Sequence, residues 1–307
     1  MPIRLDRALT LYAVWPLLRL LRANRQAIPI LMYHSVSEAL DSAQNPYYRI
    51  VTSPTAFLAQ MQLLHENGYT SCTPGAVAAQ VRSRSTALNQ VSITFDDGYR
   101  DFLENAQPVL QRFGFTATLY LPTGSIGREP LVFNSRPCLT WSQVRELQQR
   151  GVELGSHTVT HPQLRNMPRE VIRAELAESK KKIEDETGQP VESFAYPYAF
   201  PQTDRIFKAD LREMLAEAGY TDGVCTSVAR AISASDPFFL PRLPVNDEDS
   251  PGLFQAKLAG AYDWFGAVQG IAKSAKVVLG DWAVPLRGQP VCSENAGNGW
   301  DKPARPL

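Results

Sequence analysis

Short apolar runs alternate with amphipathic stretches over most of the 307 residues. The apolar runs predict buried strands at 28–33, 91–95, 115–121, 152–156, 193–196, 220–225 and 238–242. The stretches between them predict helices at 54–67, 102–113, 141–150, 168–187 and 204–218. This alternation indicates parallel strands that are joined by helical crossovers.

Two parallel architectures fit such a pattern, a doubly wound sheet and a β/α barrel. No glycine-rich phosphate loop follows the first predicted strand, so a dinucleotide-binding sheet has little support. We therefore expect a closed or partly closed β/α barrel, in which reacting groups stand where the strands end.

The segment before the first strand has its own pattern. Residues 8–21 are rich in apolar side chains, and Arg19 and Arg22 lie among or directly after the leucines, which predicts a basic amphipathic helix. The run is too short to cross a bilayer. Pro16 and Arg19 interrupt it and no small-residue cleavage site follows, which disfavours a signal peptide. Two interpretations stay open: the helix packs on the domain, or residues 8–22 contact a membrane surface.

The C-terminal part departs from the barrel pattern after Val245. A polar break, NDEDSPG, precedes a predicted helix at 253–279, and the last stretch has no periodicity. We therefore expect an amphipathic N-terminal helix at 1–27, a barrel at 28–245, a C-terminal helical extension at 246–280 and a disordered tail at 281–307.

Charge adds one exclusion. Lys plus Arg equals Asp plus Glu, 31 each, so the chain as a whole lacks the basic field that nucleic-acid binding requires. We expect a cytoplasmic protein, peripheral to the inner membrane if the first helix binds lipid; secretion stays open.

The first candidate for chemistry is the pair Asp96–Asp97, which follows a buried strand and precedes Gly98. Adjacent side chains on a strand point to opposite faces, but both can converge on one site where the strand turns. Gly98 permits such a turn. An Asp-Asp-Gly surface turn is the plain alternative, so the pair is not decisive by itself.

The second candidate is His157 with His161, four residues apart after another predicted strand. The chain has only four histidines, and half of them lie here. Two imidazoles and one carboxylate form a recognised catalytic zinc set that leaves positions open for water and substrate. Zn²⁺ is the first expectation, and Co²⁺, Ni²⁺ or Fe²⁺ suit the same ligands.

These motifs together resemble the polysaccharide deacetylase family, the NodB homology domain of carbohydrate esterase family four. The resemblance rests on MYHSV, TFDDG, the block ending in SHTVTH, and FAYPY, and spans residues 28–245. It implies a distorted, TIM-barrel-like (β/α)7 barrel, here with extra N- and C-terminal helices. It also implies that Asp97, His157 and His161 bind the metal, that Asp96 is the general base, and that the backbone N–H of Tyr198 helps to stabilise the oxyanion.

Two positions depart from the family pattern. Ala195 stands where many members have an Arg that orients the base, and Arg242, at a later strand end, is the candidate substitute. No histidine follows His161, although many members use a late histidine as general acid. His34, at the end of the first strand, is the candidate for that role, for a contact with Asp96, or for a structural histidine; Asp96 could also shuttle the proton itself.

The resemblance implies a metal-dependent hydrolase that removes N-acetyl groups from N-acetylhexosamine units of a polysaccharide or of its oligosaccharide or lipid-linked precursor. We expect a place in exopolysaccharide biosynthesis and an N-acetylated saccharide as the partner. Two alternatives stay open: a catalytically impaired carbohydrate-binding barrel, and a hydrolase of the same fold that cleaves a non-sugar C–N amide bond.

Overall fold

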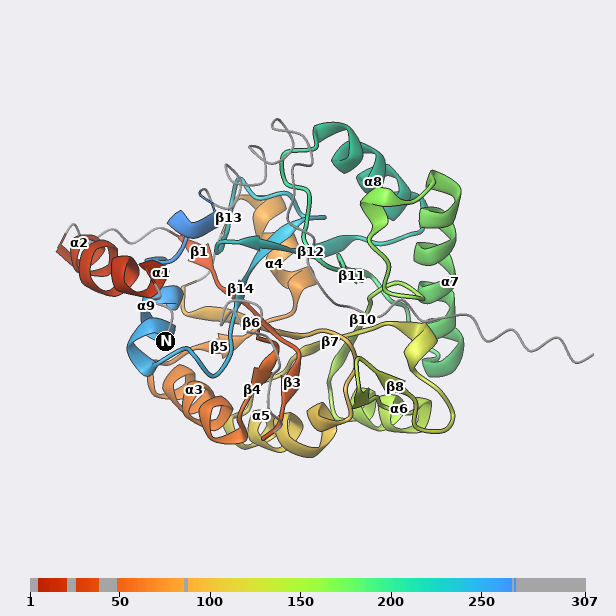
Figure 1. Ribbon diagram of the computed structural model, residues 1–307, viewed down its shortest axis with the longest axis horizontal. Coiled ribbons are helices and arrows are strands. Elements are labelled where there is room, and N and C mark those ends of the chain that lie inside the picture. Colours follow the sequence, from red (N-terminus) through yellow and green to blue (C-terminus); the bar gives the residue numbers. More distant parts are fainter. Residues whose placement is uncertain (1–4, 21–25, 39–48, 86–87, 267, 269–307) are drawn as a thin grey trace, which may run out of the picture.

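The computed structural model describes residues 5–20, 26–38, 49–85, 88–266 and 268. Seven parallel strands in this part of the chain form a closed barrel flanked by helices (Figure 1). In order around the barrel they are β2 (Ile30–Tyr33), β6 (Gln90–Phe95), β7 (Thr118–Leu121), β10 (Glu153–Ser156), β11 (Ser193–Ala195), β12 (Asp222–Val228) and β14 (Leu240–Pro244). The ring closes where Leu243 of β14 pairs with Leu31 of β2. The (β/α)7 architecture is thereby confirmed.

Helices cover the outside of the barrel and connect most neighbouring strands. They are α3 (Pro54–Glu66), α5 (Gln107–Phe113), α6 (Trp141–Gln149), α7 (Arg169–Thr187) and α8 (Arg205–Glu217). A further helix, α4 (Pro74–Ser83), covers the amino-terminal end of the barrel and packs on its inner cluster. Local sequence fixes their starts: the side chains of Ser53, Thr140 and Asp204 each accept a hydrogen bond from a backbone N–H of the first helical turn. At α6, Gln143 reciprocates and completes a capping box.

The core has two parts because side chains alternate across each strand. Leu119, Leu121 and Phe194 face outward and pack in the cluster beneath the helices. Tyr120 and Ala195 belong to a second cluster inside the barrel. The barrel is distorted between β12 and β14, where the register shifts between Val224 and Val228. This shift lies directly beside the strand that carries Arg242.

Several short elements have no counterpart in the predictions. Besides α4, these are β1 (Ala27–Ile28) with β13 (Ala231–Ile232), β3 (Ser35–Val36) with β4 (Val51–Thr52), β8 (Val132–Phe133) with β9 (Arg136–Pro137), β5 (Thr70–Ser71), and the short 3-10 turns η4 (Thr123–Ser125) and η5 (Leu164–Asn166). The helix predicted at 102–113 consists of the π-helical turn η3 (Phe102–Ala106) and α5. Strands of two residues are too short for a periodic signal.

The N-terminal helical segment consists of α1 (Leu5–Leu9), the π-helical turn η1 (Thr10–Val14) and α2 (Trp15–Leu20). It lies against α9 (Pro251–Leu258), at the left of Figure 1. No helix among the described residues is long and apolar enough to cross a membrane.

The prediction of one continuous helix at 253–279 is wrong at 259–263, whereas residues 253–258 lie in α9 as expected. The helix α9 ends at Leu258 and a turn follows, in which Gly260 has φ of 84°. A Cβ at this position would lie 1.8 Å from the Arg230 guanidinium, so the turn is built around a glycine. The predicted tail at 281–307 lies outside the described residues, and the domain boundaries stay predictions.

Candidate active site

The carboxylate pair stands at the carboxyl end of β6. Asp96 and Asp97 are 2% and 4% exposed, and the backbone of Asp97 and of Gly98 adopts left-handed φ values of 70° and 62°. This reversal directly after the strand lets both carboxylates face one site. A Cβ on Gly98 would lie 2.9 Å from a methyl carbon of Leu121, so the turn requires glycine for space as well as for conformation.

The two histidines stand on the loop that follows β10. Thr158 and His161 have left-handed φ values of 69° and 56°, and the Thr158 hydroxyl accepts a hydrogen bond from the His161 backbone N–H. The buried Glu175 of α7 holds this loop. Its carboxylate accepts hydrogen bonds from the backbone N–H groups of Val159 (2.7 Å) and Thr160 (2.9 Å) and from the Thr160 hydroxyl (2.6 Å).

Asp97, His157 and His161 present ligand atoms to one point. Asp97 Oδ1 lies 3.7 Å from His157 Nε2 and 3.5 Å from His161 Nε2. In a tetrahedral site with bonds of about 2.1 Å, ligand atoms lie roughly 3.4 Å apart. Asp97 Oδ1 is buried and has no hydrogen-bond partner among the described residues. A buried carboxylate oxygen without a partner is costly, so these three residues fit a divalent cation.

The surroundings set the charge of each ligand. Burial and the neighbouring Asp96 raise the pKa of Asp97 to about 7 in the metal-free protein. Burial lowers the pKa of both histidines, that of His161 to about 2 with a contribution from His157. Both imidazoles are therefore neutral near pH 7, the form that binds a metal.

His157 is also oriented. Its Nδ1 lies 2.8 Å from the backbone carbonyl of Ala195, which can only accept a hydrogen bond. Nδ1 therefore carries the proton, and the lone pair is on Nε2, the nitrogen nearer Asp97.

Arg242 reaches Asp96 through the inside of the barrel. Its two terminal nitrogens donate to the two carboxylate oxygens of Asp96, each at 2.7 Å, and Arg242 is fully buried. The guanidinium also donates to the Cys225 carbonyl and the Thr94 hydroxyl, both at 3.2 Å. Desolvation opposes ionisation of Asp96, but Arg242 outweighs it and holds the pKa of that carboxyl well below its usual range.

Ala195, at the position where many family members have the Arg, is buried in the cluster inside the barrel. The structure thus brings an arginine to the carboxylate from β14 instead of β11. The Arg242 guanidinium carbon lies 5.9 Å from the ring centre of Tyr120, which helps to fill the barrel beneath it.

The two remaining candidates lie at the edge of the site. His34 Nε2 is 3.9 Å from Asp96 Oδ2, and its side chain is 21% exposed. Tyr198 has a left-handed φ of 56° and a half-exposed ring whose centre is 4.6 Å from that of His161. Phe133 packs edge-on to His161 from another side, with ring centres 5.2 Å apart.

All seven candidate residues therefore lie in or beside one centre at the carboxyl ends of the strands. Two further residues, Glu175 and Thr94, contribute to the site without a signal in the sequence. Glu175 lies on a charged helix among several acidic residues, and its sequence context does not distinguish it from them. Thr94 lies two residues before Asp96, inside the predicted buried strand 91–95, where a hydroxyl side chain does not stand out.

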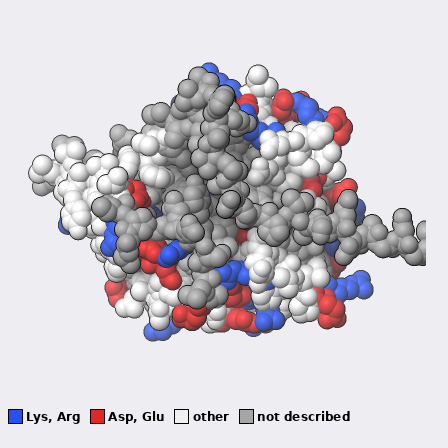
Figure 2. Space-filling view, viewed as in Figure 1, with Lys and Arg blue, Asp and Glu red and all other residues white. Residues whose placement is uncertain are grey.

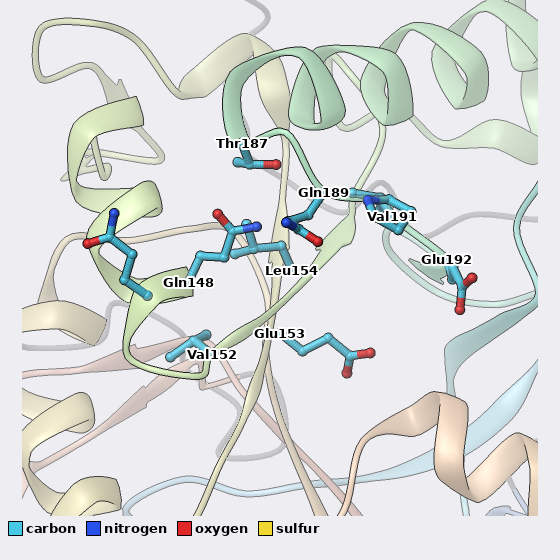
Figure 3. A pocket seen from close by; sticks show the side chains of 10 residues that line it. Gln148, Val152, Glu153, Leu154, Thr187, Gln189, Val191 and Glu192 are labelled. Atoms are coloured by element: carbon cyan, nitrogen blue, oxygen red, sulfur yellow. The ribbon is translucent and has the colours of Figure 1, made fainter.

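A separate hollow lies at the opposite end of the barrel (Figure 3). It has a volume of about 570 Å³ and is lined by the end of α6, the start of β10 and the segment between α7 and β11. None of the candidate residues lines it, so it is not part of this centre.

Known proteins resemble this chain in sequence and fold. The sequence profile of the family described as Polysaccharide deacetylase matches residues 83–223. YxkH of Bacillus subtilis, whose own name assigns it provisionally to the polysaccharide deacetylases, is 31% identical over 236 residues, which cover 76% of this chain and 75% of that protein.

Two more relatives extend the likeness. A poly-beta-1,6-N-acetyl-D-glucosamine N-deacetylase of Staphylococcus aureus is 24% identical over 167 residues, 52% of this chain and 55% of that protein. The structure of the Streptococcus pyogenes deacetylase PplD in complex with acetate superposes with a TM-score of 0.65 and 26% identity, covering 76% of this chain and 99% of that one. With a barrel, motifs and relatives in agreement, the chain belongs to the polysaccharide deacetylase family.

Proposed function

We propose that this protein is a divalent-metal-dependent hydrolase that removes N-acetyl groups from N-acetylhexosamine units of a polysaccharide or of its oligosaccharide or lipid-linked precursor. The observation that carries the proposal is the convergence of Asp97, His157 and His161 beside an Asp96 that Arg242 keeps ionised. Zn²⁺ is the expected ion, with Co²⁺, Ni²⁺ or Fe²⁺ as substitutes.

The two aspartates divide the work because their surroundings differ. Asp97, His161 and His157, whose ring is oriented by the hydrogen bond from Nδ1 to the Ala195 carbonyl, would hold the ion. When bound, the ion supplies Lewis acidity to the acetamide carbonyl and acidifies water. Asp96 is ionised at every working pH, so it can accept the proton of the attacking water without first losing one of its own. Its low pKa makes it a weak base, which is why an acidified water is needed.

The amine that leaves must gain a proton. His34 lies beside Asp96 and is partly open to solvent, so it can deliver that proton or exchange it with Asp96. We assign His34 this role in place of a late histidine. The experiment is the pH dependence of kcat/KM in His34→Gln: loss of the alkaline limb supports the role, and an unchanged profile leaves Asp96 as the shuttle.

The rim of the site suits a sugar. The half-exposed ring of Tyr198 stands beside His161, and an aromatic face can cover the apolar side of a pyranose. The Staphylococcus aureus relative is named for poly-beta-1,6-N-acetyl-D-glucosamine, which favours N-acetylglucosamine units as the first substrates to try.

The test is acetate release from N-acetylglucosamine oligomers after metal removal, with Zn²⁺, Co²⁺, Ni²⁺ and Fe²⁺ added back one at a time. We expect activity only with a metal present and its loss in Asp97→Ala and His157→Ala. Rates that survive either substitution would refute the proposed centre. A panel of non-sugar acetamides separates a sugar deacetylase from an amidase of the same fold.

The alternative of an impaired carbohydrate-binding barrel has one observation in its favour, the absence of a histidine after His161. The missing Arg no longer supports it, since Arg242 pairs with Asp96. Metal-loaded protein that binds N-acetylated oligosaccharides and releases no acetate would establish this alternative.

A further inference from the structure

The N-terminal helical segment (residues 5–20) is fixed to the domain along one face. The Tyr262 hydroxyl donates to Asp6 at 2.7 Å, and Trp264 Nε1 donates to the buried Thr10 hydroxyl at 3.1 Å. Leu11 and Trp15 approach Gly252 at the start of α9. The orientation of this segment is therefore set, and so is the face that it turns away from the domain.

That outer face is apolar. Leu5, Leu9, Tyr12, Leu17 and Leu20 are between 45% and 82% exposed. They follow one another at intervals of three to five residues, so they line one side of the helical segment. Thirteen large apolar side chains are exposed in the described chain, and these five come from only 16 residues. A concentration of this kind marks an interaction surface, in contrast to single exposed apolar residues.

The charged residues in this part of the chain are mostly basic. Residues 1–27 contain five arginines, at positions 4, 7, 19, 22 and 25, and a single acid, Asp6, which gives 5 − 1 = +4 in a chain whose net charge is zero. Asp6 accepts a hydrogen bond from Tyr262, so its charge lies on the side of the segment that faces the domain. Arg19 is exposed at the end of the stripe and stacks on Trp15, 5.5 Å from its ring. In Figure 2 the projecting lobe at the left is mostly white and shows no acidic side chains along its outer edge.

We propose that the stripe of Leu5, Leu9, Tyr12, Leu17 and Leu20 docks the protein on an anionic membrane surface. Apolar side chains on one face with flanking arginines are what an interfacial helix uses. Sixteen helical residues extend roughly 24 Å, less than the hydrocarbon core of about 30 Å, so the segment lies in the interface and does not cross it. A second copy of the chain is a poorer occupant, because a two-fold contact would bring the two basic segments together.

The experiment uses the full chain and flotation with vesicles of pure phosphatidylcholine or of phosphatidylcholine with phosphatidylglycerol. The test variant is Leu9→Ser/Tyr12→Ser/Leu20→Ser. The matched control replaces three exposed apolar residues elsewhere, Leu88→Ser/Val171→Ser/Ile206→Ser. Acetate release and thermal unfolding report that each variant is folded.

We expect wild type and control to float with anionic vesicles, and the test variant to bind about tenfold more weakly or worse, since burying one Leu is worth about that factor. Arg7→Gln/Arg19→Gln is expected to reduce binding to anionic vesicles only. Absence of wild-type flotation would overturn the proposal. Equal vesicle binding by the test variant and the control would also overturn it. A third refuting result is a wild-type protein that is dimeric and binds no vesicles, and that becomes monomeric in the test variant.

Discussion

The ion pair between Arg242 and Asp96 offers the sharpest test of the site, through the substitution Arg242→Met. Methionine keeps much of the aliphatic length and removes the charge and all four donated hydrogen bonds. Both partners are buried, so Asp96 is left as a buried charge without its counter-ion. Removing one partner of a buried pair costs about 3–5 kcal/mol. The total free energy of unfolding of a domain is about 5–15 kcal/mol, so the variant is expected to fold with much reduced stability.

The pKa of Asp96 gives the substitution its signature. In wild type the folded-state pKa lies below the unfolded value, so Asp96 adds stability that is present above about pH 4 and is lost as the pH falls. In the variant burial remains and the counter-charge is gone, so the pKa rises above the unfolded value. Asp96 then costs stability as the pH rises from about 4. The difference in unfolding free energy between the two proteins should therefore grow with pH over this range.

The assay is kcat/KM for acetate release across about pH 5–9 at saturating metal, alongside urea unfolding at each pH. We expect a loss of about 100-fold or more near neutral pH, partly recovered at high pH, as for a general base that has become protonated. Arg242→Lys keeps the charge without the two-pronged contact and should fall in between. The control is Arg173→Met, which breaks the exposed pair with Glu217 and should cost less than about 1 kcal/mol. An unshifted pH profile in Arg242→Met would show that Arg242 supports the fold and does not hold the base ionised.

Three further predictions concern the metal site. The pKa of Asp97 is raised to about 7 and both histidine pKa values are lowered, so metal binding below about pH 7 should release one proton. The metal affinity should then rise about tenfold per pH unit up to about pH 7 and stay constant above it. Competition with a chelator measures this affinity, and an affinity that does not change with pH would contradict the prediction. Glu175→Gln should weaken metal affinity about 10–100-fold by loosening the histidine loop, whereas the exposed Glu170→Gln on the same helix should leave calorimetric titrations unchanged. Gly98→Ala should lower the free energy of unfolding in urea by at least about 1–2 kcal/mol and impair acetate release, because the new Cβ would lie 2.9 Å from a methyl carbon. The control is Gly68→Ala, where φ is positive as well, at 70°, but no atom lies near the new Cβ, so only the conformational cost remains. Equal losses of stability in the two variants would exclude a steric contribution at Gly98.

Sequence patterns determined the strand and helix alternation, the barrel, and the residues that stand at strand ends. These are local properties: a buried strand, a capped helix start or an Asp-Asp-Gly turn is written within a few neighbouring positions. The barrel then follows, because alternating parallel strands and helices leave few other arrangements. The same locality explains the error at 259–263, where Gly260 ends α9 against a guanidinium from a distant loop.

Only the tertiary structure decided how the candidates meet. Arg242 is separated from Asp96 by 146 positions, and the closure of β14 onto β2 brings them to 2.7 Å. Glu175 acts on the histidine loop through the packing of α7 against β10. The domain-facing side of the N-terminal helical segment is set by contacts with residues 254 and 256 positions later. Such pairings depend on how strands and helices are placed in space, and a single sequence encodes that placement only through the sum of all its packing interactions.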